Sequence, residues 1–199
     1  VAITATIAVF FFLEPTVSSL TGTERFYAAV FQAVSVISTT GFYTVDLGGF
    51  VSGSLVLTLF LMYVGGSPSG TGGGIKNTVF LTTLKAAWDR IRQREDVYIM
   101  GKRLPKQRVI EADTVALSSL GLLMGLMTIL AYLQPGDFAA VAFEATSAIG
   151  TVGLSRGLTS ELGLAGKLLI CLLMFAGRIG TVSLVRAIFN VDTGEETTV

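Results

Sequence analysis

Residues 65–76 read GGSPSGTGGGIK and interrupt what is otherwise one long apolar segment. Residues 55–64 before them and residues 79–87 after them are largely apolar. Six glycines and one proline permit backbone angles that a helix does not hold, and proline also removes a hydrogen-bond donor. A helix that breaks at membrane depth is tolerated where its freed backbone groups meet protein or a water-filled cavity. The stretch therefore predicts an ordered intramembrane loop beside a transport pathway.

Two other interpretations of this stretch are a phosphate-binding loop and a flexible linker. A phosphate-binding loop requires Gly-Lys followed by Ser or Thr at a fixed distance from an earlier glycine, but Lys76 is followed by Asn77. A linker is not normally flanked on both sides by membrane-grade apolar sequence. The ordered loop is preferred, the linker comes second and the phosphate-binding loop third.

The composition is that of a polytopic membrane protein. Of 199 residues, 51% are hydrophobic and 14% are charged, and the mean hydropathy is +0.70. The chain has no His, which removes the usual general base and the commonest metal ligand. Its one cysteine, Cys171, stands among Leu and Ile, and we expect it to pack inside the protein. We therefore do not expect an enzyme.

Positive charge is concentrated in one segment, residues 85–108, although the formal net charge of the chain is zero. This segment holds eight of the fourteen Lys and Arg residues. Short basic loops between membrane segments are retained in the cytoplasm, so we expect this segment and the C-terminus there. A nucleic-acid-binding patch is the alternative, but the segment lacks a soluble fold around it.

Hydropathy and capping signals predict a helical chain in two comparable parts. The expected helices are residues 1–13, the end of a helix that begins before this chain, then 26–38, 50–64, 75–92, 114–133, 138–149 with Asp137 as its cap, and 164–189 interrupted at 177–180. A polar linker covers 96–111, with a possible short strand at 97–100. The parts are then a pore-forming unit at 1–95, a cytoplasmic linker at 96–112, a second unit at 113–190 and a cytoplasmic tail at 191–199.

The two parts repeat one sequence pattern at an offset of 112 residues. This offset pairs Phe31 with Phe143, Gly41 with Gly153, and Gly65 with Gly177, without a gap. Each unit reads as a span, a short re-entrant helix, a Thr/Gly segment and a broken span. An even number of crossings makes the units parallel, and parallel units surround a central pore, unlike the inverted repeats of many carriers.

The repeated Thr/Gly segments have the chemistry of a cation filter. Backbone carbonyls replace an ion's hydration shell without a fixed charge, and glycine lets successive carbonyls face one axis. Thr39 and Thr151 offer hydroxyl oxygens, and the short helices direct their partially negative C-termini at the ion path. An ordinary packing turn is the alternative, and a second copy of the segment makes it less favoured.

At this point the chain resembles the Trk/Ktr/HKT superfamily of potassium transporters, most closely its KtrB-type membrane subunits. The resemblance lies in FQAVSVISTTGF at 31–42, GGSPSGTGGGIK at 65–76 and FAGRIGT at 175–181, and Thr151-Val152-Gly153 is similar to the start of the potassium-channel signature. The resemblance covers the third and fourth of four such repeats. It implies an all-α membrane protein that forms half of a pseudo-fourfold, channel-like pore.

The resemblance also implies site residues, an ion and partners. The filter residues would be Thr39, Thr40, Gly41, Phe42, Thr151, Val152, Gly153 and Leu154. The gate would be Gly65, Gly66, Ser67, Pro68, Ser69, Gly70, Thr71, Gly72, Gly73 and Gly74, acting with Arg178. K⁺ is the transported ion, with Na⁺ as a second possibility. The partners would be the N-terminal half of the same polypeptide, a second copy of the subunit, and a cytoplasmic RCK-type ring that binds the regulatory nucleotide.

Two charged side chains leave alternatives open. Lys76, at the end of the loop, is expected to extend to the membrane interface. Glu144, which stands where the first unit has Gln32, either pairs locally or raises the cation concentration near the filter.

Two rival functions remain, an alternating-access carrier and a non-conducting structural subunit. A carrier requires coupling residues in its spans, and these spans are nearly free of carboxylates. The structural subunit gains if no other half of the pore exists in the cell.

Overall fold

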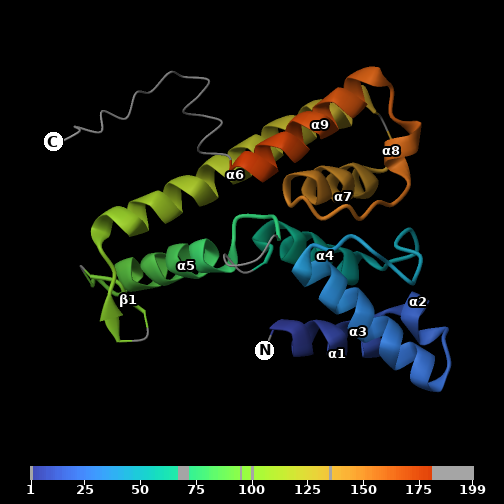
Figure 1. The fold of residues 1–199 in the computed structure, drawn as a ribbon, viewed down its shortest axis with the longest axis horizontal. Helices are drawn as coiled ribbons and strands as arrows, with labels where there is room; N and C mark the ends of the chain where they lie inside the picture. The colour runs from blue at the N-terminus through green and yellow to red at the C-terminus, as the bar shows by residue number, and fades with distance from the viewer. Residues whose placement is uncertain (1, 67–71, 95, 100, 135, 181–199) are drawn as a thin grey trace, which may run out of the picture.

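The computed structural model is a helical protein with one short hairpin, and it describes residues 2–66, 72–94, 96–99, 101–134 and 136–180 (Figure 1). The elements in chain order are α1 (Ala2–Leu13), α2 (Pro15–Ser18), α3 (Gly22–Ser38), α4 (Ser52–Val64), α5 (Asn77–Ile91), β1 (Tyr98–Ile99), β2 (Lys102–Arg103), α6 (Lys106–Leu133), α7 (Phe138–Ile149), α8 (Leu158–Glu161) and α9 (Leu164–Ile179).

The helices form two groups that meet at α4 and α7. In the first half α1 packs on α3 and α4, and in the second half α6, α7 and α9 pack on one another (Figure 1). The core of the first half is centred on Phe10, Leu47 and Met62, and it includes Phe143 of α7. The core of the second half is centred on Leu130 and Leu173. The two halves therefore meet where α4 packs on α7 and, further along the chain, where α5 packs on α6.

The two short helices end as predicted, and one of them also begins as predicted. α7 has the predicted bounds, and the Asp137 carboxylate accepts a hydrogen bond of 2.9 Å from the Ala139 N–H, which caps the helix. The predicted start of α3 at residue 26 is wrong, because the helix begins at Gly22. Thr21 is the extended residue before it, so Glu24 falls in the first turn, where it complements the helix dipole.

The predicted helix breaks differ between the halves. α4 ends at Val64, Gly65 takes a positive φ of 69°, and α5 begins at Asn77, so the break at 65–76 is confirmed at both edges. Residues 67–71 lie outside the described residues. In the second half Gly177 is still inside α9, and the helix ends at Gly180 with φ 95°. The helix therefore continues for three residues from the predicted start of the interruption at 177. The expected continuation to 189 and the tail at 191–199 lie outside the described residues.

The longest helix starts earlier than predicted. α6 runs for 28 residues from Lys106, so the predicted linker at 96–111 is helical in its last part. Pro105, which lacks an N–H, precedes the helix at the position where that donor is not needed, and residues 106–111 favour helix. Among the described helices α6 is the one long and apolar enough to cross a bilayer, with a hydropathy of 2.0. The predicted strand near 97–100 is confirmed for Tyr98–Ile99, which pairs antiparallel with Lys102–Arg103.

Large apolar side chains remain exposed over the outer faces of the helices. Tyr132 of α6 and Leu164 of α9 are 86% and 78% exposed. Such exposure suits a chain surrounded by lipid or by further protein. The predicted packing role of Cys171 is wrong for this chain, because the buried row of α9 is Gly166, Ile170, Leu173 and Ala176, and Cys171 lies beside that row and is exposed.

Candidate functional site

The two Thr/Gly segments have the same backbone conformation. Thr39 and Thr151 both take left-handed angles, with φ 54° and 49°, and Gly41 and Gly153 follow with φ 84° and 88°. A left-handed conformation is strained for threonine and easy for glycine. Its recurrence 112 residues later shows that the sequence repeat is also a structural repeat.

The same hydrogen bonds close both short helices onto these segments. The N–H groups of Thr39 and Thr40 donate to the carbonyls of Val36 and Ser35 at 3.3 and 3.0 Å. In the second half the corresponding bonds run from Thr151 to Ala148 at 3.0 Å and from Val152 to Ser147 at 2.9 Å. Each segment therefore leaves its helix through a left-handed turn that satisfies the last helical carbonyls.

The two segments lie directly against each other. A Cβ on Gly41 would overlap the carbonyl oxygen of Val152, whereas a Cβ on Gly153 would lie 3.8 Å from the Cα of Gly41. Glycine at position 41 is therefore required both by its φ angle and by the close approach of the second segment.

The side chains of the two segments point in different directions. Val152 and Leu154 are buried in the first-half core, while Phe42 is 66% exposed. The carbonyl of Phe42 accepts a hydrogen bond from the Ser35 hydroxyl, so one of its lone pairs is already used. Thr40 bonds Ser38 through their hydroxyls at 2.6 Å. The fold thus brings the two predicted filter segments together. Their residues are not equivalent in pairs, however, since Phe42 is exposed and its counterpart Leu154 is buried.

The described ends of the glycine-rich stretch form a closed neck. The Gly66 N–H donates to the Gly73 carbonyl at 3.3 Å, and the Asn77 N–H donates to the Gly66 carbonyl at 3.2 Å. The Ile75 N–H donates to the Tyr63 carbonyl at 3.2 Å, beside the end of α4. The stretch therefore leaves and rejoins the fold at one place, with residues 67–71 beyond the neck and outside the described residues.

This neck touches both Thr/Gly segments. The Gly73 N–H donates to Thr39 Oγ1 at 3.0 Å. A Cβ on Gly73 would overlap the Gly150 carbonyl and Thr151 Oγ1, and a Cβ on Gly177 would overlap the Ile149 carbonyl. Glycines of the loop and of α9 thus lie against the C-terminal ends of the two short helices, which carry partial negative charge.

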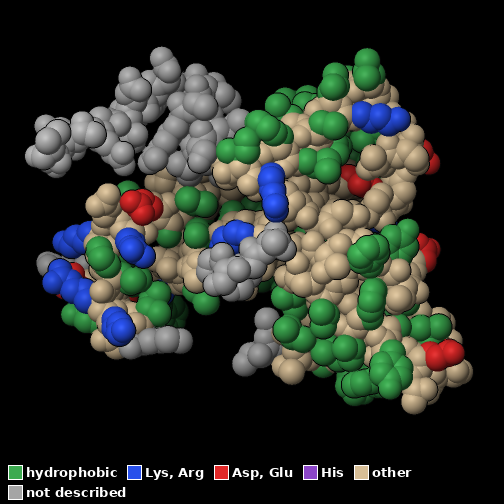
Figure 2. Space-filling model, in the orientation of Figure 1, with side chains coloured by type: hydrophobic (Ala, Val, Ile, Leu, Met, Phe, Trp, Pro, Cys, Tyr) green, Lys and Arg blue, Asp and Glu red, His purple; other side chains and the backbone are tan. Residues whose placement is uncertain are grey.

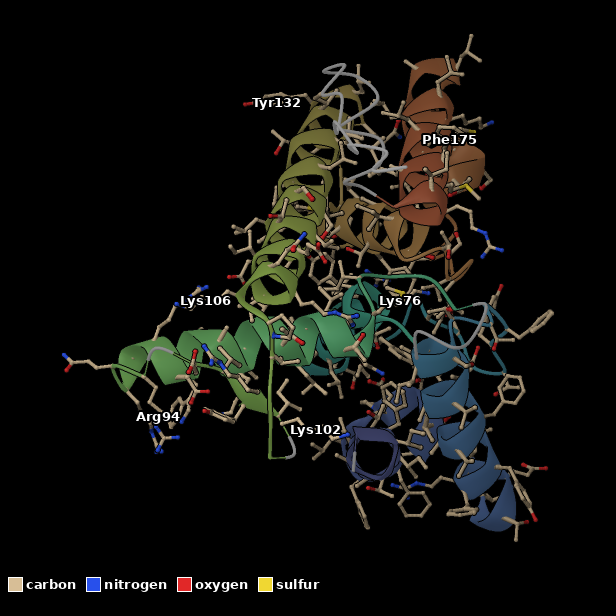
Figure 3. The ribbon with its side chains drawn as sticks, turned by 60° about the vertical axis from the view of Figure 1, so that its left-hand side comes forward. Lys76, Arg94, Lys102, Lys106, Tyr132 and Phe175 are labelled. Carbon is tan, nitrogen blue, oxygen red and sulfur yellow. The ribbon has the colours of Figure 1, made fainter. Side chains whose placement is uncertain are left out.

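Lys76 turns back into the loop. It takes a positive φ of 75°, and its ammonium group donates to the Gly72 carbonyl. The prediction that this side chain extends to the interface is wrong. Figure 3 shows Lys76 near the centre of the molecule, at the start of α5, and Arg94 beyond the other end of that helix. The strained backbone of Lys76 gives no sequence signal, so this contact was not predictable.

A cavity of about 430 Å³ lies at the neck, and its lining includes four of the predicted gate residues, Gly72, Gly73, Gly74 and Arg178. Its walls include Gly72, Gly73, Lys76, Thr151 and Arg178, from the loop, the second Thr/Gly segment and α9. Two wall residues were missed by the sequence analysis, Tyr63 and Ser119, whose hydroxyls lie 3.0 Å apart across α4 and α6. The available signal was a hydroxyl in an otherwise apolar span.

The oxygen atoms that could coordinate a cation at this site belong to uncharged groups, namely backbone carbonyls and threonine hydroxyls. No group of three or more His, Cys, Asp or Glu residues in the described part of the chain is arranged to hold a metal ion. Backbone carbonyls and threonine hydroxyls bind an ion weakly enough for it to leave again.

The basic segment gathers at the far end of α5, around the hairpin and the start of α6 (Figure 2). Several of its charges are paired: Lys85 with Asp89 at 2.6 Å, Arg103 with Asp96 at 2.7 Å, and Arg90 with Asp113 at 2.8 Å. The hydrogen bond from Lys85 and the charges of Lys85 and Arg94 lower the pKa of Asp89, against the opposing effect of its burial. Of these pairs, Arg90–Asp113 joins α5 to α6, whereas Lys85–Asp89 lies within α5 and Arg103–Asp96 closes the hairpin region.

Comparison with known proteins identifies a single family. The profile of the TrkH family, described as a cation transport protein, matches residues 1–192. The chain is 36% identical over 162 residues to the Ktr system potassium uptake protein B of Bacillus subtilis, covering 81% of this chain and 36% of that protein. It is 34% identical over 169 residues to the potassium/sodium uptake protein NtpJ of Enterococcus hirae, covering 83% and 37%. The chain thus spans little more than a third of the length of the curated relatives it matches.

The fold comparison agrees with the sequence comparison. The crystal structure of the potassium transporter TrkH from Vibrio parahaemolyticus matches with a TM-score of 0.80 and 23% identity, covering 94% of this chain and 42% of that chain. At this identity the match establishes the fold alone. The predicted class, an all-helical membrane protein, is therefore confirmed.

Proposed function

Because this chain belongs to the TrkH family of cation transport proteins, we propose that it is part of a potassium-uptake transporter that conducts K⁺ through a filter of backbone carbonyls. One observation carries this proposal. Two Thr/Gly segments with the same left-handed backbone lie against each other at the ends of two short helices. A half-length helix that ends at a carbonyl-rich segment is the arrangement that stabilises a dehydrated cation in a membrane.

The filter in this proposal is built from residues 39–42 and 151–154. Thr39, Gly41, Thr151 and Gly153 set the backbone, and the buried Val152 and Leu154 anchor the second segment in the core. Phe42 contributes less than its counterpart Leu154, because its carbonyl already accepts the Ser35 hydroxyl. K⁺ is the ion we assign, and Na⁺ is a second candidate because one relative is named a potassium/sodium uptake protein.

The gate in this proposal is the stretch 65–74 together with Arg178. Gly72 and Gly73 lie against the C-terminal ends of both short helices, and the cavity beside them is lined by Lys76 and Arg178. A cation that leaves the filter on this side meets a narrow neck and two positive charges. Ion flow therefore requires the loop to move.

The remainder of the assembly is what the family resemblance implies. Two repeats, 1–95 and 113–190, supply half of a fourfold pore, and an N-terminal half of the same polypeptide supplies the rest. The basic segment 85–108 faces the cytoplasm, as does the C-terminus. It is the docking surface for a nucleotide-binding ring of RCK type, and two copies of the membrane subunit share one ring.

The decisive test is rubidium and sodium flux through the complete protein that contains this chain, with and without a nucleotide-binding partner. Selective potassium uptake that the partner stimulates is the expected result. Replacing Gly153 by valine places a β-branched side chain at φ 88° and should abolish selective uptake. Unaltered preference for potassium over sodium in this variant would refute the filter assignment.

A second test addresses the gate. Deleting residues 67–74 removes the loop together with Gly72, Gly73 and Gly74 of its neck, and we expect a higher flux that depends less on the cytoplasmic partner. Lower or unchanged flux would mean that the loop serves only to pack the helices. Replacing Gly53, which is exposed and has open space around it, by alanine is a matched control outside the loop.

A further inference from the structure

We propose that Glu144 and Arg156 form a buried clamp that positions the second Thr/Gly segment and thereby sets its selectivity. This inference rests on the proposed function, because the clamp acts on the filter assigned above. Both residues lie outside the predicted site. Neither contacts the ion path in our proposal, so they are positioning residues.

Glu144 lies on α7 and is 4% exposed. Its Oε1 atom accepts hydrogen bonds from the Ser155 hydroxyl and, at 3.1 Å, from the Arg156 N–H. Its Oε2 atom accepts from the Thr159 hydroxyl at 2.7 Å. One carboxylate therefore accepts three hydrogen bonds from residues that directly follow the proposed filter, so Glu144 pairs locally.

Arg156 carries the connection into the other half of the molecule. Its Nε atom donates to the Leu47 carbonyl at 3.1 Å, and one terminal nitrogen donates to the Gly48 carbonyl at 2.6 Å. The other terminal nitrogen lies 3.5 Å from the Asp137 carboxylate. The Arg156 side chain is only 11% exposed, and its bonds to Leu47 and Gly48 hold the segment that follows Gly41 in the first half.

The clamp fixes the second filter segment at its far end. At the near end, the N–H groups of Thr151 and Val152 bond carbonyls of α7. At the far end, Ser155 and Arg156 bond Glu144 on the same helix. Residues 151–154 are thus tied to α7 at both ends, which restricts the shifts that would change the spacing of their carbonyls.

The first half has no such clamp in its described residues. Gln32 occupies the position of Glu144 and is fully buried, yet neither its amide oxygen nor its amide nitrogen has a hydrogen-bond partner there. The residues that correspond to Ser155, Arg156 and Thr159 are Tyr43, Thr44 and Leu47. Tyr43 is exposed and Leu47 has no polar group, so the two hydroxyl donors of the second half have no counterpart, and the Thr44 N–H does not bond the Gln32 oxygen.

A charge effect and a positioning effect predict different results for glutamine at position 144. If Glu144 acted by attracting cations, Glu144→Gln would lose the effect as fully as Glu144→Leu. In the clamp, a glutamine oxygen still accepts from Ser155 and Arg156, and its amide nitrogen donates to a rotated Thr159 hydroxyl. Glutamine should therefore rescue the function that leucine loses.

The experiment compares matched variants of the complete protein, reconstituted in vesicles, by the ratio of rubidium to sodium flux. Glu144→Leu should lower this ratio at least about tenfold, because it leaves three buried donors unpaired beside the filter. Glu144→Gln should stay within about threefold of wild type, since all three bonds can be remade. Gln32→Leu is the same change at the equivalent position and should leave the ratio unchanged.

Arg156 is tested separately through the contact between the halves. Arg156→Ala should also lower the flux ratio, while Arg156→Lys, which keeps one donor, should lower it less. Thermal unfolding in detergent, with and without potassium, separates positioning from folding: the Glu144→Leu protein should remain folded and lose stabilisation by potassium.

Three outcomes contradict the clamp. They are an unchanged flux ratio in Glu144→Leu, an equal loss in Glu144→Gln and Glu144→Leu, and an equal loss in Gln32→Leu. A wild-type protein without selective flux would instead refute the proposed function, so the two failures are distinguishable.

Discussion

The two halves of this protein have one backbone plan and different supports. Both place a left-handed threonine and a left-handed glycine after a short helix. The first half then carries a long glycine-rich loop and a buried Gln32 without a partner among the described residues. The second half has the Glu144–Arg156 clamp and Arg178. The two halves thus share the backbone geometry and differ in the side chains that support it.

The largest expected difference between the halves is at the paired glycines. Gly41→Ala adds a Cβ that overlaps the Val152 carbonyl, in addition to about 1–2 kcal/mol for a left-handed alanine. Gly153→Ala pays only the conformational term, because its nearest neighbour is the Cα of Gly41 at 3.8 Å. We expect Gly41→Ala to abolish selective rubidium uptake and Gly153→Ala to reduce it by about tenfold or less. Equal loss in both variants would mean that the two segments do not meet as described.

The next expected effect concerns Gly177 of α9, which lies against the C-terminal end of α7. A Cβ on Gly177 would overlap the Ile149 carbonyl, whereas Gly163, at the other end of α9, has open space around it. Gly177→Ala should therefore destabilise the protein by about 1–3 kcal/mol through overpacking. Thermal unfolding in detergent measures this loss, with Gly163→Ala as the control that should stay near wild type. Similar stability of the two variants would contradict the packing of α9 on the end of α7.

A smaller difference lies in one hydroxyl. Tyr63 bonds Ser119 at 3.0 Å and the Ala116 carbonyl at 3.1 Å, while its counterpart Phe175 has no hydroxyl and is 55% exposed. Tyr63→Phe makes the first half resemble the second and should cost about 1 kcal/mol. The melting temperature should then fall by about 2–4 °C. Phe175→Leu, on an exposed face, should change it less, and the reverse order would show that the Tyr63 bonds contribute nothing.

The smallest expected effect is at the joint at the end of α5, where this helix of the first half meets the hairpin and α6. Asp89 lies at the end of α5 beside the hairpin, outside the membrane-spanning segments, and Lys85 lowers its pKa. A lowered carboxylate pKa stabilises the joint above the unfolded pKa of about 4, and this contribution is lost as the pH falls through the folded value. The hydrogen-exchange protection factor of the hairpin amides, which corrects for the slower chemical exchange of amides in acid, should therefore be higher at neutral pH than in acid. In Asp89→Asn the protection factor should lack this pH-dependent step, and persistence of the step would assign it to another group.

Local signals in the sequence were enough for the helices and for the repeat. The Asp137 cap and the apolar run after it gave α7 its correct bounds, because capping acts within one turn. The glycine break was predictable because the angles it needs are unavailable to other residues. The early starts of α3 and α6 were missed, because Gly22 and the basic residues after Pro105 tolerate helix without signalling it.

The contacts within the site were less predictable, because they join residues distant in the chain. Arg156 bonds carbonyls 108 and 109 residues earlier, and a carbonyl leaves no trace in the sequence. The sequence placed Glu144 opposite Gln32 but left open whether it pairs locally, and only the folded chain brings Ser155 and Thr159 to it. The contact of Lys76 with the Gly72 carbonyl was also unpredictable, because it depends on a strained φ angle at Lys76.

The return of Lys76 to the Gly72 carbonyl gives the glycine-rich loop a charge of its own. A loop that carries one elementary charge cannot move along the membrane normal without moving that charge through the transmembrane voltage. Moving one elementary charge across the whole membrane changes its free energy by about 2.3 kcal/mol for each 100 mV of membrane potential. Moving it through a tenth of that potential changes the free energy by roughly 0.2 kcal/mol. The membrane voltage therefore acts directly on the stretch that Lys76 closes, through the charge of this one side chain.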